Sequence, residues 1–179
     1  AELVAHFSRS RTEVSGTARL FGASIDFVVD SDHEKDFLQV KANAPNAPGL
    51  AALASRLSGI EIGGGLGGQI TLATGTNLED FDVNLELDLG DASIDVPVLS
   101  WVKLPAEDGR VKTRLVLKGG RLVAIEDIDL SAGSMEAMGR ASFGTADDGT
   151  FGLVSASFER LTWPGNDIAK MMLTRDEEN

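Results

Sequence analysis

The stretch Leu78–Leu89, LEDFDVNLELDL, is the most regular part of the 179-residue chain. From Phe81 onward its apolar and polar residues alternate without a break. Side chains alternate between the two faces of a strand, so the pattern predicts a β-strand with one apolar face and one polar face. The apolar positions are Phe81, Val83, Leu85, Leu87 and Leu89, and the polar ones are Asp82, Asn84, Glu86 and Asp88. Either more protein or something that the protein binds must cover the apolar face.

Composition limits the classes of function. The chain has no cysteine, which excludes thiol catalysis, zinc-thiolate sites and iron–sulfur clusters. It carries 28 Asp and Glu against 16 Lys and Arg, a formal net charge of -12. A nucleic-acid partner requires a basic surface, so none is expected, and anionic membrane surfaces are disfavoured for the same reason.

Short alternating segments separated by turn residues run through most of the chain. Residues 1–45 predict a four-stranded β-meander with a polar loop at 30–36. Residues 46–59 place Leu50, Leu53 and Leu57 at helical spacing, with Pro48 in the first turn, and predict a short amphipathic helix. A glycine-rich connector at 63–68 leads into a second meander, within 60–170, that includes strands at 92–98 and 99–104. Residues 171–179 are expected to form a polar tail.

The predicted fold is mainly β: a long, curved antiparallel meander sheet, open as a groove or half-barrel, with about ten or eleven strands and one short helix. Strands joined by short turns pair antiparallel, because parallel pairs need long crossovers. A chain of this length fits a single domain, 1–179. It begins at Ala1, within an alternating segment and without an initiator Met, and we expect it to be a fragment of a longer protein.

Two short motifs are weak indications of chemistry. Gly63, Gly65 and Gly68 have the G-x-G-x-x-G spacing of a dinucleotide loop, but that loop works between a strand and a following helix, and here the order is reversed. Ser100 and Lys103 have the S-x-x-K spacing of a serine nucleophile and its lysine, but the companion motifs and the helix are missing. We therefore expect neither nucleotide binding nor acyl-enzyme chemistry.

Metal and carboxylate chemistry is equally weakly supported. His33 lies among Asp30, Asp32, Glu34 and Asp36, a charge run whose spacing matches no known cation loop. The pairs Asp82 with Glu86 and Asp127 with Asp129 are expected on the polar face of a one-sided sheet rather than across a cleft. We predict no catalytic residue, no metal, no cofactor and no enzyme activity.

The apolar face itself remains as the candidate functional surface. Most of its positions are expected to be ordinary core, in a closed sandwich, a barrel or an open groove. The candidate groove residues are Phe27, Val29, Val83, Leu85, Leu87, Leu115, Leu117, Ile128, Leu130 and Phe143, and the helix residues Leu50, Leu53 and Leu57 are candidates for a plug at one end. The wider apolar face also includes Leu38, Val40 and Met135.

Four segments carry a family resemblance. They are Ile94–Lys103 (IDVPVLSWVK), Leu117–Leu122 (LKGGRL), Gly139–Phe143 (GRASF) and Phe158–Asp167 (FERLTWPGND). With them the chain resembles the AsmA-like proteins of Gram-negative bacteria, in particular the large subgroup with a central domain of unknown function. The likeness is clearest over residues 78–170 and consists of strands, glycines and turns rather than catalytic residues.

The resemblance implies a location and a role. Members are anchored in the inner membrane, extend through the periplasm as repeated curved sheets, and are implicated in moving phospholipid toward the outer membrane. This implies a non-enzymatic periplasmic module whose groove binds phospholipid acyl chains beside neighbouring repeats of a parent chain. The alternative is a scaffold domain of the envelope with a closed core and protein partners.

Overall fold

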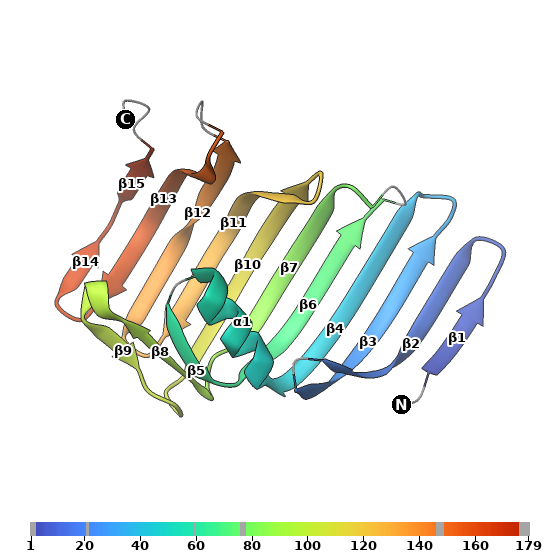
Figure 1. Cartoon of the computed structure of the whole chain (residues 1–179), viewed down its shortest axis with the longest axis horizontal. Helices are drawn as coiled ribbons and strands as arrows, with labels where there is room; N and C mark the ends of the chain where they lie inside the picture. The colour runs from blue at the N-terminus through green and yellow to red at the C-terminus, as the bar shows by residue number, and fades with distance from the viewer. Residues whose placement is uncertain (1–2, 21, 59, 76–77, 146–148, 176–179) are drawn as a thin grey trace.

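The computed structural model describes residues 3–20, 22–58, 60–75, 78–145 and 149–175, and within them it forms two antiparallel sheets and one α-helix (Figure 1). The smaller sheet contains three strands, in the order β5 (Glu61–Gly64), β8 (Ala92–Val96) and β9 (Trp101–Lys103). The larger sheet contains twelve strands: β1 (Leu3–Phe7), β2 (Arg11–Leu20), β3 (Ala23–Asp32), β4 (Phe37–Ala47), β6 (Leu66–Thr74), β7 (Phe81–Asp88), β10 (Gly109–Lys118), β11 (Arg121–Ala132), β12 (Met135–Thr145), β13 (Phe151–Trp163), β14 (Asn166–Ile168) and β15 (Met171–Thr174).

The larger sheet is open, which is one of the three arrangements that the alternation left possible. Its strands follow the order of the chain, with only the β5 and β8–β9 segments left out, and β14 and β15 both pair with β13 at the far edge. Every pair is antiparallel. The predicted fold class, a long antiparallel sheet with one short helix, is therefore confirmed.

The region 60–170 is not one meander. The predicted strands at 92–98 and 99–104 form β8, a short 3-10 turn η1 (Pro97–Leu99) and β9, which pair with β5 in the smaller sheet. The pairing of β7 with β10 along the full length of β7 leaves no place for β8 and β9 beside β7 in the larger sheet. A hydrogen bond from Leu89 N to Gly109 O closes this junction at 2.8 Å.

Three boundaries also differ from the sequence expectation. The polar run 30–36 is only partly a loop, because β3 continues through Asp32 and β4 begins at Phe37. The glycine-rich connector at 63–68 is largely strand, since it contains the end of β5 and the start of β6. The expected polar tail contains β15, whose apolar residues Met171, Met172 and Leu173 pair with residues 156–158 of β13.

The helix α1 (Pro48–Ser58) lies across one end of the strands, beside the smaller sheet (Figure 1). Proline is favoured in the first turn because its missing N–H needs no partner there. Leu50 on this helix packs against both buried clusters of the molecule. The first cluster contains Ala51, Leu66, Leu89, Ala92, Trp101, Ala132 and Met135, and the second contains Ala23, Ile25, Ala44 and Ala47. Both clusters lie at this covered end, so the core does not extend along the whole face of the sheet.

Candidate functional site

An uninterrupted line of apolar residues crosses the larger sheet at directly paired positions. Paired residues on neighbouring strands lie on the same face, so the whole line belongs to one face. We call it the apolar row, and it crosses every strand of the larger sheet except β14. Its members are Ala5, Val14, Val29, Val40, Leu72, Val83, Leu115, Ile125, Ala141, Ala156 and Leu173.

The face that carries the apolar row is covered at one end only. Positions near α1 and the smaller sheet are buried, among them Ile25, Leu89 and Ala137. The row positions Val40 and Val83 are only half-buried. Figure 1 shows why: α1 and β5, β8 and β9 lie in front of the lower part of the sheet and leave the upper part bare. We call these two parts the covered half and the open half.

The pairing places the predicted groove residues on the same face as Val83. Val29, Val83 and Leu115 belong to the apolar row, and Phe143 reaches the open half, where its ring stacks on Phe151 at a centroid distance of 6.4 Å. Two candidates are covered instead, because Leu87 and Leu130 pack against the first cluster. The others on this face are Phe27, Leu85 and Leu117.

Ile128 occupies a special place among the candidates. It alternates with Leu130 along β11, and its partner in β12 is Gly139, which has no side chain. Ile128 also borders a hollow on the other side of the sheet, at a register shift.

The predicted helix plug is only partly described. Leu50 faces the sheet and borders an apolar cavity of about 40 Å³ at the boundary between the covered and open halves. The other residues that line this cavity are Ile25, Ala42, Ala44, Gly68, Ile70 and Leu87. The side chains of Leu53 and Leu57 lie outside the described residues.

The opposite face is polar, and several of its carboxylates form ion pairs with arginine and lysine side chains. Arg114 donates from Nε to Asp82 Oδ1 at 2.7 Å and from Nη1 to Glu126 Oε2 at 3.2 Å. The hydrogen bond from Arg114 lowers the pKa of the Asp82 carboxyl. Lys112 lies 3.2 Å from Glu86. Asp82 and Glu86 of β7 therefore form ion pairs on an exposed surface, in agreement with the expected polar face.

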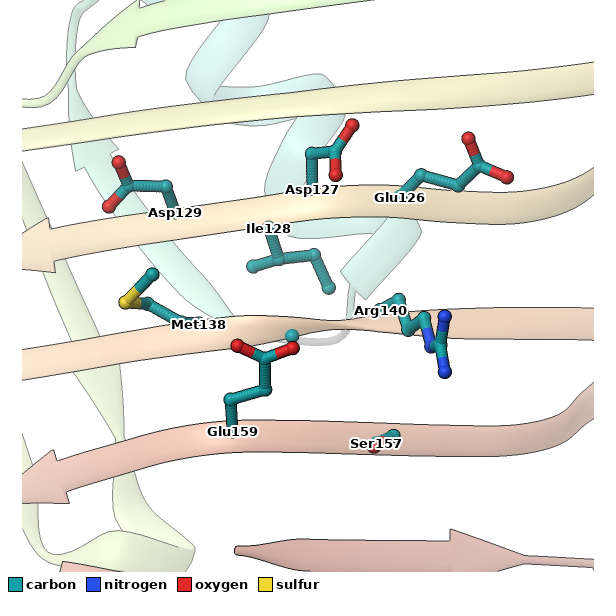
Figure 2. A pocket seen from close by; sticks show the side chains of 9 residues that line it. Glu126, Asp127, Ile128, Asp129, Met138, Arg140, Ser157 and Glu159 are labelled. Carbon is teal, nitrogen blue, oxygen red and sulfur yellow. The ribbon is translucent and has the colours of Figure 1, made fainter. Parts of the chain in front are cut away.

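A hollow of about 490 Å³ opens on this polar face (Figure 2). It lies where β11 shifts register between Ile125 and Ile128, and Asp127 there has a φ of 52°. Asp tolerates this left-handed region better than most residues. Its polar lining includes Glu126, Asp129, Arg140, Ser157 and Glu159. The sequence analysis did not predict this hollow. Its signal in the sequence is the doublet Glu126–Asp127, which breaks the alternation of apolar and polar residues and is typical of a β-bulge.

The glycines of the G-x-G-x-x-G spacing have packing roles. A Cβ at Gly65 would lie 1.7 Å from Asn46 Oδ1, and one at Gly68 would lie 2.1 Å from Glu86 O. Gly68 also has a φ of 139°, which other residues rarely adopt. These residues allow β6 to approach its neighbours closely, and a strand rather than a helix follows them.

The S-x-x-K spacing also has a structural explanation. Lys103 is fully buried, and its Nζ donates to Ala92 O at 3.0 Å and to Leu104 O at 3.1 Å. Ser100 is exposed at the turn after η1, with a left-handed backbone. The lysine therefore links the two strands of the β8–β9 hairpin through backbone carbonyls.

The polar side chains around His33 form hydrogen bonds and ion pairs with neighbouring residues of the chain. Asp32 pairs with Lys35 at 3.1 Å, and Asp30 accepts two hydrogen bonds from Arg11, at 2.7 and 2.6 Å. His33 Nε2 lies 3.2 Å from Thr12 Oγ1. Within the described ranges, no group of three or more His, Cys, Asp and Glu side chains is arranged to hold a metal ion.

Comparisons with protein-family models, curated proteins and solved structures find no match to this chain. In the part of the chain that the structure describes, no helix has the length and apolar character needed to span a bilayer. The resemblance to AsmA-like proteins therefore stays a prediction, and the functional argument rests on the apolar face.

Proposed function

We propose that this protein is a non-enzymatic periplasmic module that binds phospholipid acyl chains on its open apolar face and passes them between the inner and outer membranes. The observation that carries the proposal is the apolar row, which crosses the sheet without a polar residue while only one end of the face is covered. The AsmA-like resemblance of the sequence supplies the proposed location, the periplasm between the two membranes.

The chemistry of the face suits an acyl chain. Each methylene that leaves water contributes about 0.8 kcal/mol without any directional contact, so an acyl chain needs a continuous apolar surface rather than a polar site. Half-buried side chains such as Val40, Leu72 and Val83 offer that surface along the open half. The ion pairs of the opposite face keep that face in water.

The burial pattern also separates this proposal from the scaffold alternative. A closed core would bury the apolar face along its whole length, but the buried clusters lie at the covered end. Beyond them, Val29 and Leu115 are only half-buried. The pattern favours an open binding face over a closed sandwich.

The test uses two neighbouring residues of β10 that face opposite ways. Leu115→Gln places an amide in the apolar row, and Val116→Gln places the same group on the polar face, opposite Asp82. Purified protein is incubated with vesicles of palmitoyl-oleoyl-phosphatidylethanolamine, separated from them, and examined by native mass spectrometry. We expect Leu115→Gln to lower bound lipid about twofold, because a polar group buried without a partner costs on the order of 1–3 kcal/mol and excludes acyl chains from that part of the row, and Val116→Gln to retain it.

Circular dichroism confirms that both variants are folded. A folded Leu115→Gln variant with undiminished lipid would exclude the open half as the binding surface. Equal losses in both variants would show that the lipid is not held on one face. Either result would leave the scaffold alternative as the better explanation.

A further inference from the structure

The apolar cavity of about 40 Å³ beneath α1 lies directly beside the apolar row. Two of the residues that line it, Ala42 of β4 and Ile70 of β6, pair with each other. Each lies two positions along its strand from a member of the row, Val40 or Leu72, and therefore on the same face. A ligand on the row can reach the cavity without crossing a polar side chain.

Burial around the cavity shows from which side it is accessible. Ile25 is 6% exposed and Ala44 is 5% exposed, whereas Ala42 and Ile70 are only half-buried. Leu50 of α1 closes the covered side, because it packs against both buried clusters. The cavity is therefore closed beneath the helix and accessible from the open half.

The cavity results from small residues at paired positions. Ala44 and Gly68 lie opposite each other, and neither has a side chain that fills the space between the sheet and Leu50. A larger residue does not fit at Gly68, because its φ is 139° and a Cβ there would lie 2.1 Å from Glu86 O. An apolar cavity of this kind stays dry, and its walls lack the dispersion contacts that an apolar ligand atom would supply.

We propose that this cavity binds the terminal methyl group of an acyl chain that lies on the open half. A cavity needs about 15 Å³ to hold one water-sized group, so there is room here for a methyl or an ethyl group. The lining residues have no charged or hydrogen-bonding side chain, which excludes a lipid headgroup from the cavity. This inference rests on the proposed lipid binding and adds to it the direction of the bound chain, with its methyl end beneath α1.

The test uses a lipid with a single chain, palmitoyl-lysophosphatidylcholine. One sample carries ¹³C in the terminal methyl group of the chain, and a second carries it in the methylene beside the carbonyl. The zwitterionic headgroup avoids repulsion from the net charge of -12. Isotope-filtered NMR spectra, recorded with protein in excess over lipid, identify the protein protons that give nuclear Overhauser effects (NOEs) to each label. We expect NOEs to Ile25, Leu50 and Ile70 from the terminal methyl group and none from the methylene.

Two alanine-to-leucine variants provide the matched comparison. Ala42→Leu fills the cavity, and Ala141→Leu makes the same change at a half-buried position of the apolar row outside the cavity. We expect Ala42→Leu to remove the cavity NOEs and to weaken binding about fourfold, the contribution of one buried methylene. Ala141→Leu should leave both unchanged. Titration of the labelled methyl signal gives the affinity, and circular dichroism shows whether each variant is folded.

The possible outcomes separate the cavity from the proposed function. Bound lipid whose terminal methyl group gives NOEs to Val83 but not to Ile25 and Ile70 would overturn the cavity site and leave the open half as the binding surface. An unmodified chain that binds no lipid would overturn both. Cavity NOEs that persisted in a folded Ala42→Leu variant would also contradict the inference, because the filled cavity has no room for the methyl group. If Ala42→Leu does not fold, the NOEs of the unmodified chain decide between these outcomes.

Discussion

At the scale of single residues, Lys103 shows how a charged side chain can serve as core. It is fully buried, and Gly109 packs so closely on it that a Cβ there would lie 2.6 Å from Lys103 Cε. Its ammonium group has two carbonyl acceptors, and its four methylenes fill the space beside Leu89. The side chain thus combines the packing of an apolar residue with a hydrogen-bonded end.

Two substitutions separate these contributions. Lys103→Ala removes the stem and the ammonium group, and we expect it to lower the free energy of unfolding by about 2–4 kcal/mol through the cavity that it leaves. Lys103→Met keeps most of the volume, and replacing a buried charge by an apolar residue of similar size costs less than about 1.5 kcal/mol. Urea unfolding followed by circular dichroism measures both. Equal losses would assign the stability to the two hydrogen bonds rather than to the stem.

The ion pair of Asp82 and Arg114 predicts a pH dependence. The pKa of Asp82 is lowered below its ordinary value of 3.8, chiefly by the hydrogen bond from Arg114. A lowered folded-state pKa adds stability above the unfolded value, and this contribution is lost as the pH falls through the folded value. The pair is more than one-third exposed, so its contribution at neutral pH is small.

We therefore expect Asp82→Asn to be less stable than the unmodified chain at neutral pH, and the difference to disappear as the pH falls through the folded-state pKa of Asp82. Urea unfolding across this range gives the difference. In an Arg114→Gln background the same substitution should have little effect, because its partner is already absent. A difference that persisted at the acid end would contradict an electrostatic origin.

At the scale of elements, the smaller sheet packs on the larger sheet and covers part of its apolar face, the covered half. Trp101 is its main anchor: it is 4% exposed, lies in the first buried cluster, and donates from Nε1 to Ser134 Oγ at 3.3 Å. Its neighbour Val102 points away from the core and is 50% exposed. A substitution at Trp101 should therefore weaken the packing of the smaller sheet, and one at the adjacent Val102 serves as its control.

We expect Trp101→Ala to cost about 3–5 kcal/mol and to increase the binding of an apolar dye such as ANS, because Leu87 and Leu130 lose their cover. Val102→Ala should cost less than about 1 kcal/mol and leave dye binding unchanged. Denaturant unfolding and dye fluorescence, both without lipid, make the comparison. If the tryptophan variant lost stability without gaining dye binding, the larger sheet would not depend on this cover.

The elements also show what the sequence could predict. Alternation along Phe81–Asp88 identified β7 and its apolar face, because a period of two is a local property of the strand. It could not show that Leu87 is covered while Val83 is open, since both have the same parity and the cover comes from other elements, α1 and the smaller sheet. The separate sheet of β5, β8 and β9 was missed for the same reason, as it follows from the long-range pairing of β7 with β10.

At the scale of the whole molecule, the length of the apolar row has consequences for the proposed function. Neighbouring strands lie about 4.8 Å apart, so the row from β1 to β15 is roughly 50 Å long. One leaflet of a bilayer has a hydrocarbon thickness of about 15 Å, half of the full core. The row therefore has room for about three acyl chains end to end, and a chain must travel along it to be passed on.

A substitution in the middle of the row should slow the movement of lipid along the row more than it weakens the binding of lipid. Val83 is the middle member of the row, and Leu173 is its last. We expect Val83→Gln to slow transfer of a fluorescent phospholipid between vesicles of palmitoyl-oleoyl-phosphatidylcholine about tenfold, because one unpaired amide in the path costs on the order of 1–2 kcal/mol. Bound lipid should fall only about twofold, since half of the row remains on either side.

Leu173→Gln is the matched control, because it places the same amide at the end of the row, and we expect it to change transfer less than about twofold. If both variants slowed transfer equally, lipid would not pass through the middle of the sheet. If Val83→Gln abolished binding together with transfer, the lipid would occupy one central site, and the continuity of the row would be a property of folding rather than of transport.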